Sequence, residues 1–183
     1  MAVKTFTTEV LTSADTNTYL ANSGLVYVTS ATVGTGVSTV TVSNAFSSTY
    51  DNYHIIYSGG LGSTNANVAL SLGSTSTGYY GSLFGSTYAA GTPVGIGINN
   101  GNFWLYLGFI NTSYALMSID LFHPNLARVT NISSNWSFNF ASTGYSMFAG
   151  EQASSTQFTS FIMAPSSGTI TGGTITVYGY RKA

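Results

Sequence analysis

Short runs of strand-forming residues, separated by turns rich in Gly, Ser, Thr and Asn, fill the sequence from residue 25 to residue 180. In several runs apolar and polar residues alternate, the two-residue period of a strand with one buried face. The runs predicted to be strands are 25–28, 40–42, 53–57, 68–72, 103–107, 115–121, 136–140, 158–162 and 174–178. About eight to ten short strands without a long helix predict an all-β fold, an antiparallel β-sandwich or jelly roll.

The segments between these runs are predicted to be turns and loops. Asn111, Thr112 and Ser113 are predicted to join runs 103–107 and 115–121 as neighbouring strands. Three segments rich in Gly, Ser, Thr, Asn and Tyr are predicted to be loops, namely 59–67, 73–79 and 85–101. Because neither a repeat of fixed period nor a linker interrupts the pattern, residues 25–183 are predicted to form one jelly-roll-like domain.

Residues 1–24 differ from the rest and are predicted to form an N-terminal attachment arm with a short helix. Residues 12–15 fit a capping box, and Gly24 can end the helix. A helix of about two turns is marginal on its own, so we expect it to dock on a partner. The apolar side chains expected to make that contact are Val10, Leu11, Tyr19 and Leu20.

Charge is scarce, since charged residues make up 5% of the chain, the net charge is −1 and hydrophobic residues make up 44%. Affinity for nucleic acid comes mostly from Lys and Arg, so a nucleic-acid partner is not expected. Net charge keeps proteins apart, so we expect the chain to cover much of its surface in a homo-oligomer. The alternative is a monomer kept soluble by Ser, Thr, Asn and Gly. The most apolar stretch, 103–110, is too short to span a bilayer, and no membrane insertion is expected.

Two acid–histidine pairs are the strongest indication of enzyme chemistry. Asp51 with His54, and Asp120 with His123, each show D-x-x-H spacing. Strand positions three apart point to opposite faces, so neither pair is expected to converge. We interpret Asp51 as part of a turn entering a strand, and His123 as the end of one. The sequence contains no Cys, and no catalytic residue, metal site or cofactor is predicted.

Tyrosines in Asn- and Gly-rich segments indicate a possible recognition surface, because aromatic faces stack on sugars or on a partner protein. The alternative is the rim of a subunit interface, or ordinary positions in a sheet. The residues considered for this surface are Tyr79, Tyr80, Phe84, Tyr88 and Tyr145.

Three segments of the chain resemble phage proteins. Residues 6–20 read FTTEVLTSADTNTYL, which is similar to the opening of many tailed-phage tail and fibre proteins. The segment departs from that pattern at Glu9 and Thr16. Residues 46–55 read FSSTYDNYHI and residues 172–181 read GGTITVYGYR. These two resemble a family of small phage virion proteins, with His54 in place of the usual basic residue and Thr176 in place of Arg.

The resemblance implies a structural component of a tailed-phage particle, made in the host bacterial cytoplasm and located on the virion surface. It favours a tail-associated protein of the minor-tail or fibre type, with a capsid decoration protein or a free carbohydrate-binding module as alternatives. It also implies a homotrimer whose partners are a tail or major capsid protein and, as a further option, a host surface glycan. No catalytic residue carries over from the family.

Overall fold

The computed structural model describes residues 24–89, 91, 93–139 and 143–182 of the chain. The first strands are β1 (Leu25–Thr32), β2 (Val40–Val42), β3 (Asn52–Ser58), β4 (Leu61–Gly62), β5 (Ala66–Leu72), β6 (Tyr79–Thr87) and β7 (Pro93–Gly101). The remaining strands are β8 (Gly108–Ile110), β9 (Ala115–Phe122), β10 (Thr130–Asn139), β11 (Thr143–Gln152), β12 (Phe161–Pro165), β13 (Ile170–Thr171) and β14 (Thr174–Tyr180). All pairings are antiparallel, which confirms the predicted all-β sandwich.

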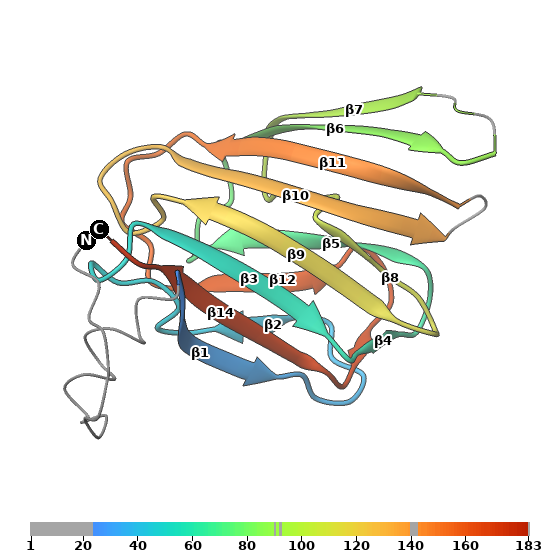
Figure 1. Cartoon of the computed structure of the whole chain (residues 1–183), viewed down its shortest axis with the longest axis horizontal. Helices are drawn as coiled ribbons and strands as arrows, with labels where there is room; N and C mark the ends of the chain where they lie inside the picture. The colour runs from blue at the N-terminus through green and yellow to red at the C-terminus, as the bar shows by residue number, and fades with distance from the viewer. Residues whose placement is uncertain (1–23, 90, 92, 140–142, 183) are drawn as a thin grey trace, which may run out of the picture.

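The strands form two layers of unequal width (Figure 1). The wide layer has the order β1-β14-β3-β9-β10-β11-β6-β7, and the narrow layer has the order β2-β12-β5-β8. Strand β8 also pairs with the first residues of β9, so it joins the layers at one end. Because the narrow layer has fewer strands, β6 and β7 extend beyond its edge (Figure 1).

The core lies between the layers and is formed by alternate residues of the strands. In β3 the buried positions are Tyr53, Ile55 and Tyr57, with the residues between them half-buried. Strand β9 shows the same two-residue alternation. Both strands were predicted from the sequence, and their alternating burial is that expected where one face of a strand meets a core.

The prediction of a strand at 103–107 is wrong, because this segment forms an isolated bridge with β5, between Trp104 and Leu70, instead of a continuous ladder. Trp104 is fully buried, and its Nε1 lies 3.2 Å from the carbonyl oxygens of both Tyr80 and Glu151. Tyr106 then adopts a φ of 69°, a left-handed conformation that breaks an extended chain. The strand that pairs with β9 follows directly, as β8.

The prediction of a loop over 85–101 is also wrong, since this range holds the end of β6 and the whole of β7. Gly95 and Gly97 stand at alternate positions of β7, and so its alternation of side chains is hard to see in the sequence. Strand β11 was not predicted, and strand β4 and the start of β5 lie in the predicted loop 59–67. The predicted arm helix, with Val10, Leu11, Tyr19 and Leu20, lies outside the described residues. None of the residues that are described belongs to a helix of the length and hydropathy that a membrane span needs.

Candidate functional site

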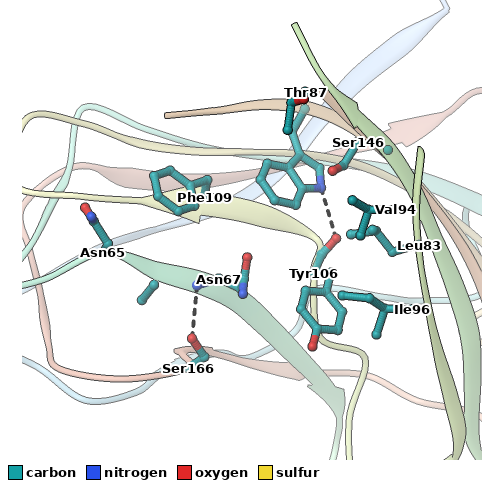
Figure 2. Close-up of a pocket in the computed structure, with 13 residues that line it drawn as sticks. Asn65, Asn67, Leu83, Thr87, Val94, Ile96, Tyr106, Phe109, Ser146 and Ser166 are labelled. Atoms are coloured by element: carbon teal, nitrogen blue, oxygen red, sulfur yellow. Dashed lines mark hydrogen bonds between the residues drawn. The ribbon is translucent and has the colours of Figure 1, made fainter. Parts of the chain in front are cut away.

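A cavity of about 330 Å³ lies under the part of the wide layer that the narrow layer leaves uncovered. Its lining comes from the inner faces of β6, β7, β10 and β11, from the start of β5 and from the segment leading into β8. Figure 2 shows Leu83, Val94 and Ile96 along one side, with Tyr106 next to Ile96 and Phe109 across from them. A concave space of this size is typical of small-ligand sites.

Aromatic side chains form one wall of the cavity. The rings of Phe109 and Trp136 are parallel within 3°, with centroids 6.1 Å apart. Trp136 Nε1 donates a hydrogen bond of 3.0 Å to the carbonyl oxygen of Tyr106, drawn as a dashed line in Figure 2. This bond ties the wall to Tyr106, the residue with the left-handed backbone. Strained backbone that surrounding contacts hold in place is common at binding sites.

The opposite wall is aliphatic, and polar groups stand at the rim. Val94 and Ile96 of β7 are 40% and 37% exposed, although they face the inside of the wide layer. The polar residues of the lining are Asn65, Asn67, Thr87, Ser146 and Ser166. Ser166 Oγ accepts a 3.0 Å hydrogen bond from the backbone N–H of Asn67 (Figure 2).

No charged side chain is among the described residues that line this cavity. An ionic ligand would lose hydration there without gaining a counter-charge, so the cavity suits an uncharged group that is partly apolar. The described lining also contains no carboxylate and no imidazole.

The aromatic residues predicted to form a recognition surface do not gather in one place. Tyr79 is fully buried, and this part of the prediction is wrong. Its hydroxyl accepts a hydrogen bond from the N–H of Leu72 and donates one to the carbonyl of Thr75, which fixes the ring in the core. Phe84 and Tyr145 are 52% and 41% exposed, but they lie on the outer face of the wide layer.

The other two aromatic residues predicted for the recognition surface, Tyr88 and Tyr80, also differ in exposure. Tyr88 is 63% exposed beyond the end of β6, and Tyr80 is half-buried. The cavity uses instead Tyr106, Phe109 and Trp136, which the sequence analysis did not single out. The only sequence signal for them was their aromatic character, because their convergence depends on the pairing of β8, β9 and β10.

The outer face of the wide layer carries a second candidate, a polar cluster that crosses three strands. His54 and Asp120 are register partners, and His54 Nδ1 lies 2.7 Å from Asp120 Oδ1. The Tyr180 hydroxyl donates a 2.6 Å hydrogen bond to the same oxygen. Ser118 Oγ lies 3.4 Å from His54 Nε2. The order Ser–His–Asp matches that of a hydrolytic triad.

Electrostatics keep the tyrosine of this cluster protonated. Burial, together with the hydrogen bond to Asp120 and the negative charge of that carboxylate, raises the pKa of Tyr180 from 10.0 to about 12. A neutral hydroxyl therefore donates to Asp120 across the whole physiological range of pH. Asp120 thus accepts bonds from side chains of both β14 and β3, and links three strands of the sheet.

Neither D-x-x-H pair converges, as the sequence analysis predicted. His54 pairs with Asp120, while Asp51 precedes β3 and its carboxylate lies 2.8 Å from Lys182 Nζ. His123 follows β9, and its N–H donates to the carbonyl of Asp51. Within the described part of the chain, no three His, Asp or Glu side chains come together as a metal site would need.

The geometry of the Ser118 cluster supports a structural link better than hydrolysis. The distance of 3.4 Å between Ser118 Oγ and His54 Nε2 is at the long end for a hydrogen bond. The three side chains stand on the sheet's outer face, apart from the cavity that could hold a substrate. Catalysis of acyl transfer needs a bound carbonyl beside the nucleophile, and also donors for the oxyanion.

The two segments that resemble phage virion proteins lie side by side in the sheet. Residues 46–55 lead into β3, residues 172–181 contain β14, and the two strands pair along six register positions. The Tyr57 hydroxyl donates a 2.9 Å bond to the carbonyl of Gly172. A Cβ at Gly179 would overlap the ring of Tyr50, so only glycine fits there without a shift. Both segments thus supply contacts that build the fold.

Comparison of the chain with protein-family models, curated proteins and solved structures found no match.

Proposed function

We propose that the chain is a structural component of a tailed-phage particle, associated with the tail, and that it acts through its surfaces. One observation carries the proposal: the segments that resemble phage virion proteins contact each other across β3 and β14, where residues 53–55 are register partners of residues 177–179. The resemblance therefore includes residues that contact each other in the folded chain. Such contacts are what a shared fold would preserve.

The surface of the molecule supports a role in an assembly. Large apolar or aromatic side chains are exposed on the wide layer and its edges, including Tyr27 at 59%, Phe84 at 52% and Met147 at 50%. Phe84 and Met147 are directly opposite each other on β6 and β11, so they form one patch. With few charges to keep molecules apart, patches of this kind favour association. This supports a homo-oligomer bound to other virion proteins, trimeric by the resemblance.

Mass spectrometry of purified virions of the encoding phage tests this proposal. The chain should be present at a stable ratio to the major structural proteins through successive purification steps. Separation of tails from heads should then place it in the tail fraction, whereas recovery with heads would favour the decoration alternative. Absence from purified particles, despite expression in infected cells, would contradict a structural role.

A second candidate function, binding of a neutral glycan at the host surface, follows from the cavity. A pyranose has a C–H face that stacks on aromatic rings and hydroxyls that bond to amides. The cavity combines the Phe109–Trp136 wall with rim side chains such as Asn67, and its described lining has no charge. These features match an uncharged sugar better than an acidic one.

Titration calorimetry with neutral oligosaccharides tests this second function. Asn67→Ala, which removes a rim amide, should weaken binding about tenfold, equivalent to the loss of about 1.4 kcal/mol. Asn135→Ala is the matched control, because Asn135 is exposed on the outer face and should leave affinity unchanged. Equal affinity in the two variants, or binding of acidic sugars only, would contradict a glycan site in this cavity.

A further inference from the structure

Strand β7 is a free edge of the wide layer. Among the described strands it pairs with β6 alone, so the backbone groups on its other side have no strand partner. It is nine residues long. The strand at the other edge of the wide layer, β1, has eight residues, and the strand at the edge of the narrow layer, β2, has three. An unpaired edge of this length is a template for the addition of another strand.

Over residues 94–98, the edge at β7 lacks the features that usually block such pairing, since its register irregularity with β6 lies between Ile98 and Gly101. Proteins protect edges with charged residues, proline, bulges or short strands. Strand β1 has a register irregularity between Tyr27 and Thr29, and β2 is short. In β7 the proline stands at the first position, and residues 94–98 contain neither a charge nor a proline. This stretch is therefore open to an added strand.

The sequence of this stretch is self-complementary. Residues 94–98 read VGIGI, with Val94, Ile96 and Ile98 on the inner face of the sheet, opposite Gly85, Leu83 and Gly81. Antiparallel pairing with a second copy, centred on Ile96, places Ile96 opposite its own counterpart and Val94 opposite Ile98. All apolar side chains then share one face, and all glycines share the other. Because no residue of the stretch is charged, the two-fold contact brings no like charges together.

We propose that β7 is a two-fold contact between two copies of this chain, in which residues 94–98 pair antiparallel across the edge. The contact covers Val94 and Ile96, which are 40% and 37% exposed in the single chain. It satisfies edge backbone groups and removes apolar surface from water in one step. It also continues the apolar face beside the cavity from one copy into the other.

This inference rests on the proposed role in an assembly and gives that assembly one definite contact. Antiparallel pairing of identical strands is isologous, so it joins copies in pairs. A trimer, as the resemblance implies, needs a second and different contact, for which the Phe84–Met147 patch on the outer face is available. Together the two contacts produce even-numbered oligomers, a dimer or a pair of trimers.

Cysteine cross-linking of the full chain tests the proposal, since the sequence contains no Cys. Directly opposed residues of an antiparallel pair fall within the Cα separation of about 4.4–6.8 Å that a disulfide spans. Ile96→Cys should therefore form a covalent dimer under mild oxidation. A mixture of Val94→Cys and Ile98→Cys proteins should cross-link to each other more than either does to itself. Tyr27→Cys, at an exposed position of the β1 edge, is the matched control and should remain uncross-linked.

Light scattering of the wild-type chain supplies the second readout. The expected result is an even-numbered oligomer at micromolar concentration, which Ile96→Lys dissociates while circular dichroism remains that of a folded β protein. A wild-type monomer or trimer, or cross-linking of Ile96→Cys no faster than that of Tyr27→Cys, would overturn the proposal. Virion membership is measured separately, so loss of the two-fold contact and loss of the structural role are distinguishable outcomes.

Discussion

Gly179 shows how a single residue of a shared motif can determine packing. It lies in β14, beside β3, and the Tyr50 ring occupies the space where a Cβ would be. The ring packs in turn on Tyr53, with centroids 6.0 Å apart and planes at 79°. The absence of a side chain at residue 179 thus allows an aromatic side chain before β3 to cover the neighbouring strand.

Gly179→Ala should destabilise the fold by about 1–3 kcal/mol, because an added methyl group in a filled site forces its neighbours to shift. Urea unfolding followed by circular dichroism measures the change. Gly34→Ala is the matched control, since a Cβ at this exposed position would meet only a side-chain methyl group of Val37, at 3.3 Å. If the two variants unfold at the same urea concentration, the Tyr50 contact does not constrain residue 179.

Tyr180 gives the fold a dependence on alkaline pH. Its pKa is raised from 10.0 to about 12 by burial and by Asp120, so the folded state holds the proton more tightly than the unfolded state does. This contribution to stability is complete below pH 10 and is lost as pH rises toward 12. Burial also raises the pKa of Tyr57 and of Tyr79, which act in the same direction.

Tyr180→Phe should therefore reduce, without abolishing, the fall in unfolding free energy between pH 10 and pH 12. Urea unfolding at a series of pH values measures this slope. Tyr88→Phe, at a side chain that is 63% exposed, serves as the control and should keep the wild-type slope. An unchanged slope in Tyr180→Phe would show that the bond to Asp120 does not stabilise the protonated tyrosine.

At the scale of elements, β3 depends on the turn that precedes it. The Tyr53 hydroxyl accepts a hydrogen bond of 2.8 Å from the Ser47 N–H and donates one of 2.9 Å to the Ser47 carbonyl. Tyr53 itself is fully buried, so the turn is fixed to the core through this one side chain. The motif at 46–55 thus joins a strand to its own entry turn.

Tyr53→Phe should cost about 1–3 kcal/mol, because it leaves both backbone groups of Ser47 without their partner. Thermal or urea unfolding provides the measurement. Tyr145→Phe makes the same chemical change at a side chain that is 41% exposed, and it should be nearly neutral. A neutral effect at Tyr53 would mean that water replaces the hydroxyl in the turn.

The strands that were predicted from the sequence differ from those that were missed in how clearly apolar residues alternate along them. Strands β3, β5 and β9 have one face against the core, and their apolar residues alternate accordingly. Strand β7 has glycine at alternate positions and lies at an edge, so it carries little of that signal. Segment 103–107 has the apolar residues of a strand but forms an isolated bridge between Trp104 and Leu70 instead of a continuous ladder, a difference that its sequence does not reveal.

The candidate sites were less predictable than the strands, because they arise from pairing between distant segments. His54 and Asp120 meet only through the register of β3 with β9. The cavity depends on Trp136, Phe109 and Ile96, which come from three separate strands. A sequence shows which residue types are available, whereas the order of strands in the sheet decides which of them meet.

At the scale of the whole molecule, the unequal width of the two layers determines where the cavity and the free edge at β7 lie. The narrow layer covers one part of the wide layer and leaves the inner face of β6 and β7 open. That open face provides the cavity, and its margin provides the free edge at β7. The broad outer face carries exposed aromatic and apolar side chains, which the proposed contacts with other proteins would cover.

A density map of the intact phage particle tests whether the chain is a structural protein of its tail. We predict that the chain can be traced in the virion, on its tail, with neighbouring copies paired through residues 94–98. We also predict that Phe84 and Met147 are covered by a neighbouring protein. A map that accounts for every ordered protein of the particle and contains no copy of this chain would contradict the claim.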